Sequence, residues 1–193
     1  MDWRLTHGIY SLSLHHHWLG TFFSDVEKAS IPFMVVATSA LWLLDRPGAT
    51  RKWKLAAGSA LTSAGLALLI NVVLHTLWDR PRPYETHNIS HPWSTSTDAS
   101  FPSDHASASL AIAFTLLAFD LPVGIAFLLV AVLIAVGRVF VGAHYPGDVA
   151  ASVVVAAVSA VVVVRFGRSL VAFLVRIVER VTDPVLRPLW RRG

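Results

Sequence analysis

The sequence predicts an all-α protein, a polytopic membrane helix bundle with five or six spanning helices and amphipathic terminal helices. Of the 193 residues, 54% are hydrophobic and only 15% are charged, whereas an ordinary soluble domain carries about 25% charged residues. Five apolar segments approach the roughly 20 residues that a helix needs to cross a bilayer core. The chain therefore has too little polar surface for a water-soluble globule, and its length favours one membrane-embedded domain over residues 1–193.

The five expected spans are residues 28–44, 55–78, 103–119, 122–140 and 147–164. A further stretch, residues 170–190, spaces arginines among Val, Leu and Ile, which is typical of an amphipathic helix that lies on an anionic membrane surface. Residues 5–23 mix apolar side chains with histidines. This segment is either a second surface helix or a short, tilted sixth span, and the sequence does not favour one over the other.

Basic residues flank the apolar segments and fix the expected orientation. Four lie in the loop between the first two spans (Arg46, Arg51, Lys52 and Lys54), and seven arginines follow the fifth span. By the positive-inside rule both regions face the cytoplasm, so the loops at residues 79–102 and 141–146 face the outside. The net charge of +4 is thus explained by topology signals, and we expect no nucleic-acid partner.

The first outer loop contains the run Arg80, Pro81, Arg82 and Pro83. The prolines stiffen the backbone around Arg82, and its guanidinium is a planar fork of donors that suits phosphate oxygens. Contact with lipid headgroups is the alternative, and for Arg82 taken alone it is the better supported one.

Ser103 and His105 open the third apolar segment. Ser103 follows Pro102 at the position of a helix N-cap, where free N–H groups and the helix dipole attract an anion. His105 lies in the first turn and can point at the same anion. The alternative for this tetrapeptide is a plain capped helix start with a solvated histidine.

Arg138, His144 and Asp148 surround the second outer loop. A charged Arg138 near the end of a span is costly unless it reaches water or an anion. His144 and Asp148 are four residues apart across Pro146, which suits the opening of a helix. The carboxylate can then orient the imidazole and raise its basicity. The alternative is a pair of side chains that merely cap the fifth helix.

These three groups converge, because the expected topology puts them at the same membrane face. Two arginines, a serine at a helix N-terminus and two histidines describe a phosphate pocket that contains a nucleophile and an acid. Each group is a weak signal alone, and their common location makes phosphoryl transfer the predicted chemistry.

Other polar residues give weaker predictions. Consecutive histidines at residues 15–17 point in different directions on a helix and do not form a metal cluster. The spacing of His87 and His91 matches no recognised zinc motif. Asp25 and Glu27 are expected to be solvated at the outer mouth, with a role in substrate binding or catalysis as the alternative.

Together the motifs resemble the signature of the type-2 phosphatidic acid phosphatase superfamily. That signature is Lys-x6-Arg-Pro, Pro-Ser-x-His and Ser-Arg-x5-His-x3-Asp. The chain has His75-x6-Arg82-Pro83, Pro102-Ser103-Asp104-His105 and Gly137-Arg138-x5-His144-x3-Asp148, and all internal spacings match. Residues 98–105 and the run from His144 to Asp148 further resemble bacterial undecaprenyl-diphosphate phosphatases of the BcrC type.

Two positions depart from the superfamily signature. His75 stands in place of the lysine, and Gly137 stands in place of the serine. A neutral His75 offers one bond to a phosphate and no charge, so whether it touches the substrate stays open. Arg80 is our hypothesis for the side chain that supplies part of the missing charge.

The resemblance implies a metal-independent phosphohydrolase that needs no cofactor and forms a phosphohistidine intermediate. His144 would be the nucleophile, Asp148 its orienting partner, and His105 the acid that protonates the leaving group. The phosphoryl oxygens would be held by Arg82, Ser103 and Arg138.

The implied substrate is undecaprenyl diphosphate, cleaved to undecaprenyl phosphate and inorganic phosphate at the outer face of a bacterial inner membrane. This reaction recycles the carrier lipid of cell-wall synthesis. Phosphatidylglycerophosphate, phosphatidic acid or another lipid phosphate is the alternative substrate. A third alternative is a non-enzymatic lipid-binding or lipid-translocating protein with a degenerate site, which the joint presence of His105, His144 and Asp148 disfavours. The oligomeric state stays open.

Overall fold

The structure is a computed structural model that describes residues 2–46, 48, 50–87, 89, 96 and 98–190. Within these residues it is built from helices and their connections, without a strand. The elements are α1 (Asp2–His15), α2 (His17–Ala40), the 3-10 helix η1 (Leu41–Leu44), α3 (Lys52–Leu77), α4 (Pro83–Thr86), α5 (Asp104–Phe119), α6 (Leu121–Phe140), α7 (Pro146–Phe166) and α8 (Arg168–Trp190).

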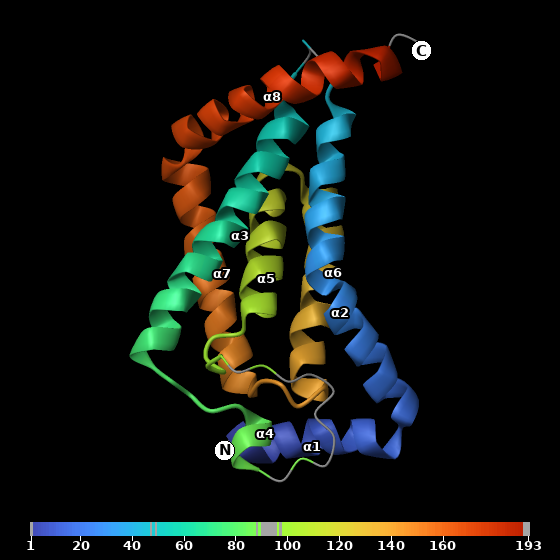
Figure 1. The fold of residues 1–193 in the computed structure, drawn as a ribbon, viewed down its shortest axis with the longest axis vertical. Coiled ribbons are helices and arrows are strands. Elements are labelled where there is room, and N and C mark those ends of the chain that lie inside the picture. The colour runs from blue at the N-terminus through green and yellow to red at the C-terminus, as the bar shows by residue number, and fades with distance from the viewer. Residues whose placement is uncertain are drawn as a thin grey trace.

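The five long or apolar helices α2, α3, α5, α6 and α7 run roughly side by side along the long axis (Figure 1). Short α5 is central and contacts the other four. All its side chains from Ala106 to Ala113 are buried, which is the pattern of a helix surrounded by protein. Many of them are Ala or Ser, and small side chains let helix backbones approach closely. At Gly124 in α6, an added Cβ would lie 2.5 Å from the backbone of Leu117.

The predicted fold class is confirmed. Four helices are long and apolar enough to cross a membrane, His17–Leu44, Lys52–Leu77, Leu121–Phe140 and Pro146–Phe166, and α5 is a fifth, shorter apolar helix. The helix pattern is that of a multi-pass membrane protein, with apolar side chains such as Leu129, Val154 and Phe166 exposed on its outer surface.

The predicted start of the first span at residue 28 is wrong. α2 begins at His17 and includes Asp25, Glu27 and Lys28. The sequence-based boundary left out Asp25 and Glu27, which were expected to be solvated at the outer mouth. In the structure Asp25 is exposed and lies 3.9 Å from Lys28, whereas Glu27 forms an ion pair with Arg138 of α6.

The segment at residues 5–23 is neither one surface helix nor a sixth span. The chain leaves helical geometry at His16, with φ −122° and ψ 83°, so the segment is divided between α1 and the first turns of α2. α1 has 14 residues and lies across one end of the bundle (Figure 1).

The amphipathic C-terminal helix α8 lies across the opposite end of the bundle (Figure 1). It is attached to α3 through Lys54, whose side chain is only 2% exposed. The Lys54 Nζ atom lies 2.7 Å from an Asp183 carboxylate oxygen and 3.3 Å from one of Glu179. The basic loop and α8 thus share one end, while α1, α4 and the predicted site loops share the other.

Candidate active site

A cavity of about 250 Å³ opens at the α1 end of the bundle. Four of the predicted site residues line it, namely Arg82, His105, Arg138 and His144. Its wall also contains Glu27, Ser96, Asp98, Pro102 and Asp104. The cavity therefore joins the interior of α2 at Glu27, the start of α5 and the end of α6 to the two loops that the motifs occupy. Gly142 has a φ of 71°, a left-handed conformation that glycine adopts without strain, and it turns the chain from α6 towards His144.

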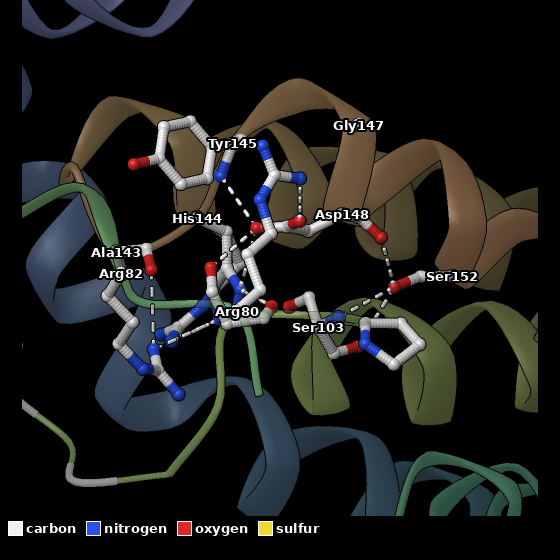
Figure 2. A network of polar contacts seen from close by, with 12 residues as sticks. Arg80, Arg82, Ser103, Ala143, His144, Tyr145, Gly147, Asp148 and Ser152 are labelled. Atoms are coloured by element: carbon white, nitrogen blue, oxygen red, sulfur yellow. Dashed lines mark hydrogen bonds and ion pairs between the residues drawn. The ribbon is translucent and has the colours of Figure 1, made fainter. Parts of the chain in front are cut away.

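The imidazole of His144 is held on both sides, and its partners fix its tautomer. Nδ1 lies 2.7 Å from the carbonyl oxygen of Ser100, which can only accept, so Nδ1 carries the proton. Nε2 lies 3.2 Å from an Arg82 nitrogen and 3.1 Å from an Arg138 nitrogen. Guanidinium groups can only donate, so Nε2 carries the lone pair. The lone pair of His144 Nε2 is thus directed at the two arginines, of which Arg82 is labelled in Figure 2.

The surroundings of His144 keep it neutral. The side chain is 2% exposed. Burial, followed by the positive charges of Arg138 and Arg82, lowers the pKa of His144 to about 3, against the opposing effect of Asp148. At neutral pH the imidazole is uncharged, which a nitrogen nucleophile requires.

Both cavity arginines are buried and each has one carboxylate partner. Arg82 is 3% exposed, and Arg138 is 2% exposed. Arg82 donates from Nε to the Asp98 carbonyl and from Nη2 to the Asp98 carboxylate, both at 3.0 Å. Arg138 forms its ion pair with Glu27. Buried charges of this kind persist because they are paired, and the pairing positions both guanidiniums beside His144.

Asp148 lies beside His144 but is not its direct hydrogen-bond acceptor. The Asp148 carboxylate is 3.7 Å from His144 Nδ1, a longer distance than the contact with Ser100. Asp148 accepts hydrogen bonds from the Ser100 hydroxyl at 2.5 Å and from the Tyr145 N–H at 2.9 Å. It therefore acts on His144 through its charge and by fixing Ser100, whose carbonyl holds the imidazole.

Arg80 is directed away from the cavity. Its guanidinium lies 2.5 Å from the carboxylate of Asp148 and 2.8 Å from that of Asp2, and it stacks at 4.1 Å over the ring of Tyr145. An Asp2 oxygen also accepts from the N–H of Gly147, where an added Cβ would lie 2.6 Å from Asp2. In this geometry Arg80 connects α1 to Asp148. No contact of its side chain among the described residues supports the hypothesis that Arg80 supplies charge to the substrate.

Ser103 lies at the start of α5, as expected, with its side chain fully buried. Its N–H donates to the hydroxyl of Ser152 in α7 at 3.0 Å. The Ser103 hydroxyl has no hydrogen-bond partner among the described residues. Its backbone N–H is thus occupied and its hydroxyl is not, but Ser103 is not among the residues that line the cavity.

His75 lies outside the residues that line the cavity. Its Nε2 is 3.0 Å from the carbonyl oxygen of Pro102 and 4.0 Å from Asp104. Ligand atoms of His75, Asp98 and Asp104 lie within 4.8 Å of one another, but Asp98 already binds Arg82, and Asp104 accepts from Asn71 at 2.6 Å. We therefore assign these side chains to the hydrogen-bond network. His87 stacks on Trp3 at 3.6 Å, and His91 lies outside the described residues.

Four residues of the site network were not predicted as such. Ser100 acts through a backbone carbonyl, and Ser152 through a hydroxyl inside an apolar helix. Asp2 is 78 residues from Arg80 in sequence, so no local pattern relates the two. Glu27 was expected to be solvated, yet its side chain is 11% exposed. A span that extended further towards the N-terminus would have placed this carboxylate inside the bundle and required a cationic partner for it.

Comparisons with known proteins agree with this geometry. The family model described as the PAP2 superfamily matches residues 56–171. The chain belongs to the PAP2 superfamily. The matched region contains the three motifs but not Glu27.

Individual relatives within the PAP2 superfamily are similar over most of the chain. Undecaprenyl-diphosphatase BcrC of Bacillus subtilis is 30% identical over 191 residues, which cover 97% of this chain and 96% of the relative. The Bacitracin transport permease protein BcrC of Bacillus licheniformis is 28% identical over 132 residues, 68% of this chain and 63% of that protein.

Two solved structures share the fold. Aquifex aeolicus LpxE has a TM-score of 0.71 and 20% identity, covering 86% of this chain and 95% of that one. A PAP2 type phosphatidylglycerolphosphate phosphatase from Bacillus subtilis has a TM-score of 0.62 and 21% identity, covering 86% of each chain. The chain is thus a multi-pass membrane protein with the fold of PAP2 lipid phosphatases.

Proposed function

We propose that this protein hydrolyses undecaprenyl diphosphate to undecaprenyl phosphate and inorganic phosphate, without a metal ion or cofactor. One observation carries the proposal: the neutral His144 directs its Nε2 lone pair into a cavity between two buried guanidiniums. A nucleophile placed among fixed positive charges suits transfer of an anionic phosphoryl group.

The proposed reaction has two steps. In the first, His144 Nε2 attacks the terminal phosphorus and forms an N–P bond while the bond from phosphorus to the bridging oxygen breaks. His105, which lines the same cavity, gives its proton to the leaving lipid monophosphate. In the second, His105 takes a proton from water, the water oxygen attacks phosphorus, and the N–P bond breaks to release inorganic phosphate.

The protein's contribution to the barrier is electrostatic. Phosphoryl transfer requires in-line positioning and neutralisation of charge on the equatorial oxygens. Arg82, Arg138 and the first turn of α5 line the cavity in which these oxygens would lie. Ser103, at the N-cap of α5, does not line the cavity, and we propose that its hydroxyl, which has no partner among the described residues, turns towards a bound phosphoryl group. Because the guanidiniums are buried and fixed, they need little reorganisation when the reaction occurs.

The substrate assignment is supported by the full-length similarity to Undecaprenyl-diphosphatase BcrC. The cavity lies at the end of the spanning helices, so a lipid phosphate can enter while its tail stays in the bilayer. The basic loop and α8 lie at the other end, and by the positive-inside rule we place the cavity on the outer face of a bacterial inner membrane. We treat residues 1–193 as one domain for this reaction.

The test is a phosphate-release panel with purified protein in detergent and EDTA. The substrates are undecaprenyl diphosphate, phosphatidic acid and phosphatidylglycerophosphate, and His144→Ala is the control. We expect release from undecaprenyl diphosphate by the native protein and none by His144→Ala. Release from phosphatidylglycerophosphate without release from undecaprenyl diphosphate would reject the substrate assignment but keep the reaction class.

A further inference from the structure

Glu27 is a buried carboxylate inside a cavity that should bind an anion. It comes from α2, outside residues 56–171 that the PAP2 family model matches. We propose that Glu27 is a positioning residue that holds Arg138 for phosphate binding and makes the cavity select a phosphoryl group that carries a proton. This inference rests on the proposed phosphatase function and specifies which ionic form of the substrate binds.

The positioning follows from which edge of Arg138 is occupied. Glu27 Oε1 pairs with Nη1 of Arg138. The opposite edge of a guanidinium, formed by Nε and Nη2, presents two parallel N–H donors and binds phosphate in a bidentate manner. Nη2 reaches His144 Nε2 at 3.1 Å, and Nε is buried without a hydrogen-bond partner among the described residues. Glu27 therefore holds Arg138 by one end and leaves its phosphate-binding edge beside the nucleophile.

The phosphate-binding edge of Arg82, unlike that of Arg138, is already occupied. The bidentate edge of Arg82 is occupied by the carbonyl and the carboxylate of Asp98, and its Nη1 faces His144. Of these two cavity arginines, Arg138 has the bidentate edge that phosphate can take without displacing a carboxylate. Its orientation depends on Glu27.

The preference for a phosphoryl group that carries a proton follows from the charges that face Glu27. The cationic groups are Arg138 from α6 and Arg82 from the loop, and each is neutralised by one carboxylate, Glu27 or Asp98. Asp104 of α5 adds a further negative charge, and His105 and His144 complete the titratable lining. On α2 itself, Asp25 and Lys28 are exposed and pair with each other.

The second oxygen of Glu27, Oε2, is buried and has no hydrogen-bond partner within the described part of the chain. A fully ionised phosphate would bring only acceptors to this oxygen, and like charges in a buried site repel strongly. A phosphate that retains one proton can donate its O–H to Oε2. The cavity should therefore bind the protonated form more tightly.

Phenylphosphonate tests this selection without a lipid substrate, because its monoanion carries one O–H group, its dianion carries none, and its P–C bond is not hydrolysed. Its affinity for the full-length protein in detergent and EDTA is measured by calorimetry at about pH 5 and about pH 8, on either side of its second ionisation. Glu27→Gln keeps an oxygen that can accept from Arg138 but removes the charge. We expect its affinity at the higher pH to exceed that of the native protein by about tenfold or more, with little difference at the lower pH.

The matched control is Asp25→Asn, which removes the same charge from an exposed position of the same helix and should behave as the native protein does. Glu27→Ala, which also removes the contact with Arg138, should lower kcat by about tenfold or more, and Glu27→Gln should restore most of the loss. Equal phenylphosphonate affinities of Glu27→Gln and native protein at both pH values would overturn the inference, as would no phenylphosphonate binding by the native protein. The expected binding pattern without hydrolysis of undecaprenyl diphosphate would keep this inference and reject the proposed substrate.

Discussion

The ion pair between Arg80 and Asp148 should be one of the strongest couplings in the molecule. Asp148 is completely buried, and the side chain of Arg80 is 21% exposed, with 2.5 Å between their charged atoms. A hydrogen bond between charged groups contributes about 1.5–3 kcal/mol, and removing one partner of a buried pair costs about 3–5 kcal/mol. The Arg80 side chain is partly exposed to water and also pairs with Asp2, so the loss of Arg80 should cost less stability than the loss of Asp148.

We therefore expect Arg80→Ala to lower the free energy of unfolding by about 2 kcal/mol and Asp148→Ala by about 4 kcal/mol. The double variant should lose about 1–2 kcal/mol less than the sum of the single losses. The assay is denaturant unfolding in detergent, followed by the fluorescence of the seven tryptophans. Arg4→Ala, an exposed position on α1, is the control and should change the stability by less than about 0.5 kcal/mol.

The same variants separate positioning from substrate binding. Within the described part of the chain, the Arg80 side chain pairs with no residue that lines the cavity, and it is linked to His144 through Asp148 and Ser100. Arg80→Ala should therefore lower kcat and leave KM nearly unchanged. Stability losses of the two single variants that add up to the loss of the double variant within about 0.5 kcal/mol would refute this reasoning. An activity loss that appears only as a raised KM would also refute it.

Three further predictions concern stability. Lys54→Met removes the partner of the partly buried Asp183 carboxylate and leaves Glu179 with Arg51, so it should cost about 3 kcal/mol in thermal denaturation. Lys52→Met, at a 45% exposed side chain, should cost less than about 1 kcal/mol. Equal losses would contradict the role of Lys54 in fixing α8. The pKa of His144 is lowered to about 3 in the folded state, so below about pH 6.5 the unfolded chain binds a proton at this residue and the folded chain does not. The free energy of unfolding should therefore fall by up to about 1.4 kcal/mol for each pH unit below about 6.5. His144→Asn should lack this contribution, and parallel stability-against-pH curves for the variant and the native protein would contradict it. Ser152→Ala leaves the buried N–H of Ser103 unpaired and should cost about 1–3 kcal/mol; a neutral effect in chemical denaturation would show that water replaces the hydroxyl.

Much of the architecture is encoded in local patterns that a single sequence reveals. Apolar segments of bilayer length predict the spans, and basic residues predict which ends lie together. Helix starts at Pro102 and Pro146 predict where the motifs meet. For this reason the structure brings together Arg82, His105 and His144 from separate segments, as expected from the shared membrane face.

The site network depends on contacts that local patterns do not encode. Arg80 and Arg82 both lie in one Arg-Pro-Arg-Pro run, and only the path of the backbone determines that Arg82 faces the cavity while Arg80 faces Asp148. The acceptor for His144 is a carbonyl group, which every residue possesses. Glu27 was expected to be solvated, with a role in the site only as the alternative, because its partner Arg138 is more than a hundred residues later in the sequence.

The most direct test of the proposed mechanism is rapid-quench labelling with undecaprenyl diphosphate that carries radioactive phosphorus in its terminal phosphate, in the presence of EDTA. The account predicts an early burst of protein-bound label that is stable to base and labile to acid, as expected for a phosphohistidine, and that maps to His144. His144→Ala should show neither label nor phosphate release. Turnover with label on another residue, or full turnover by His144→Ala, would contradict the account.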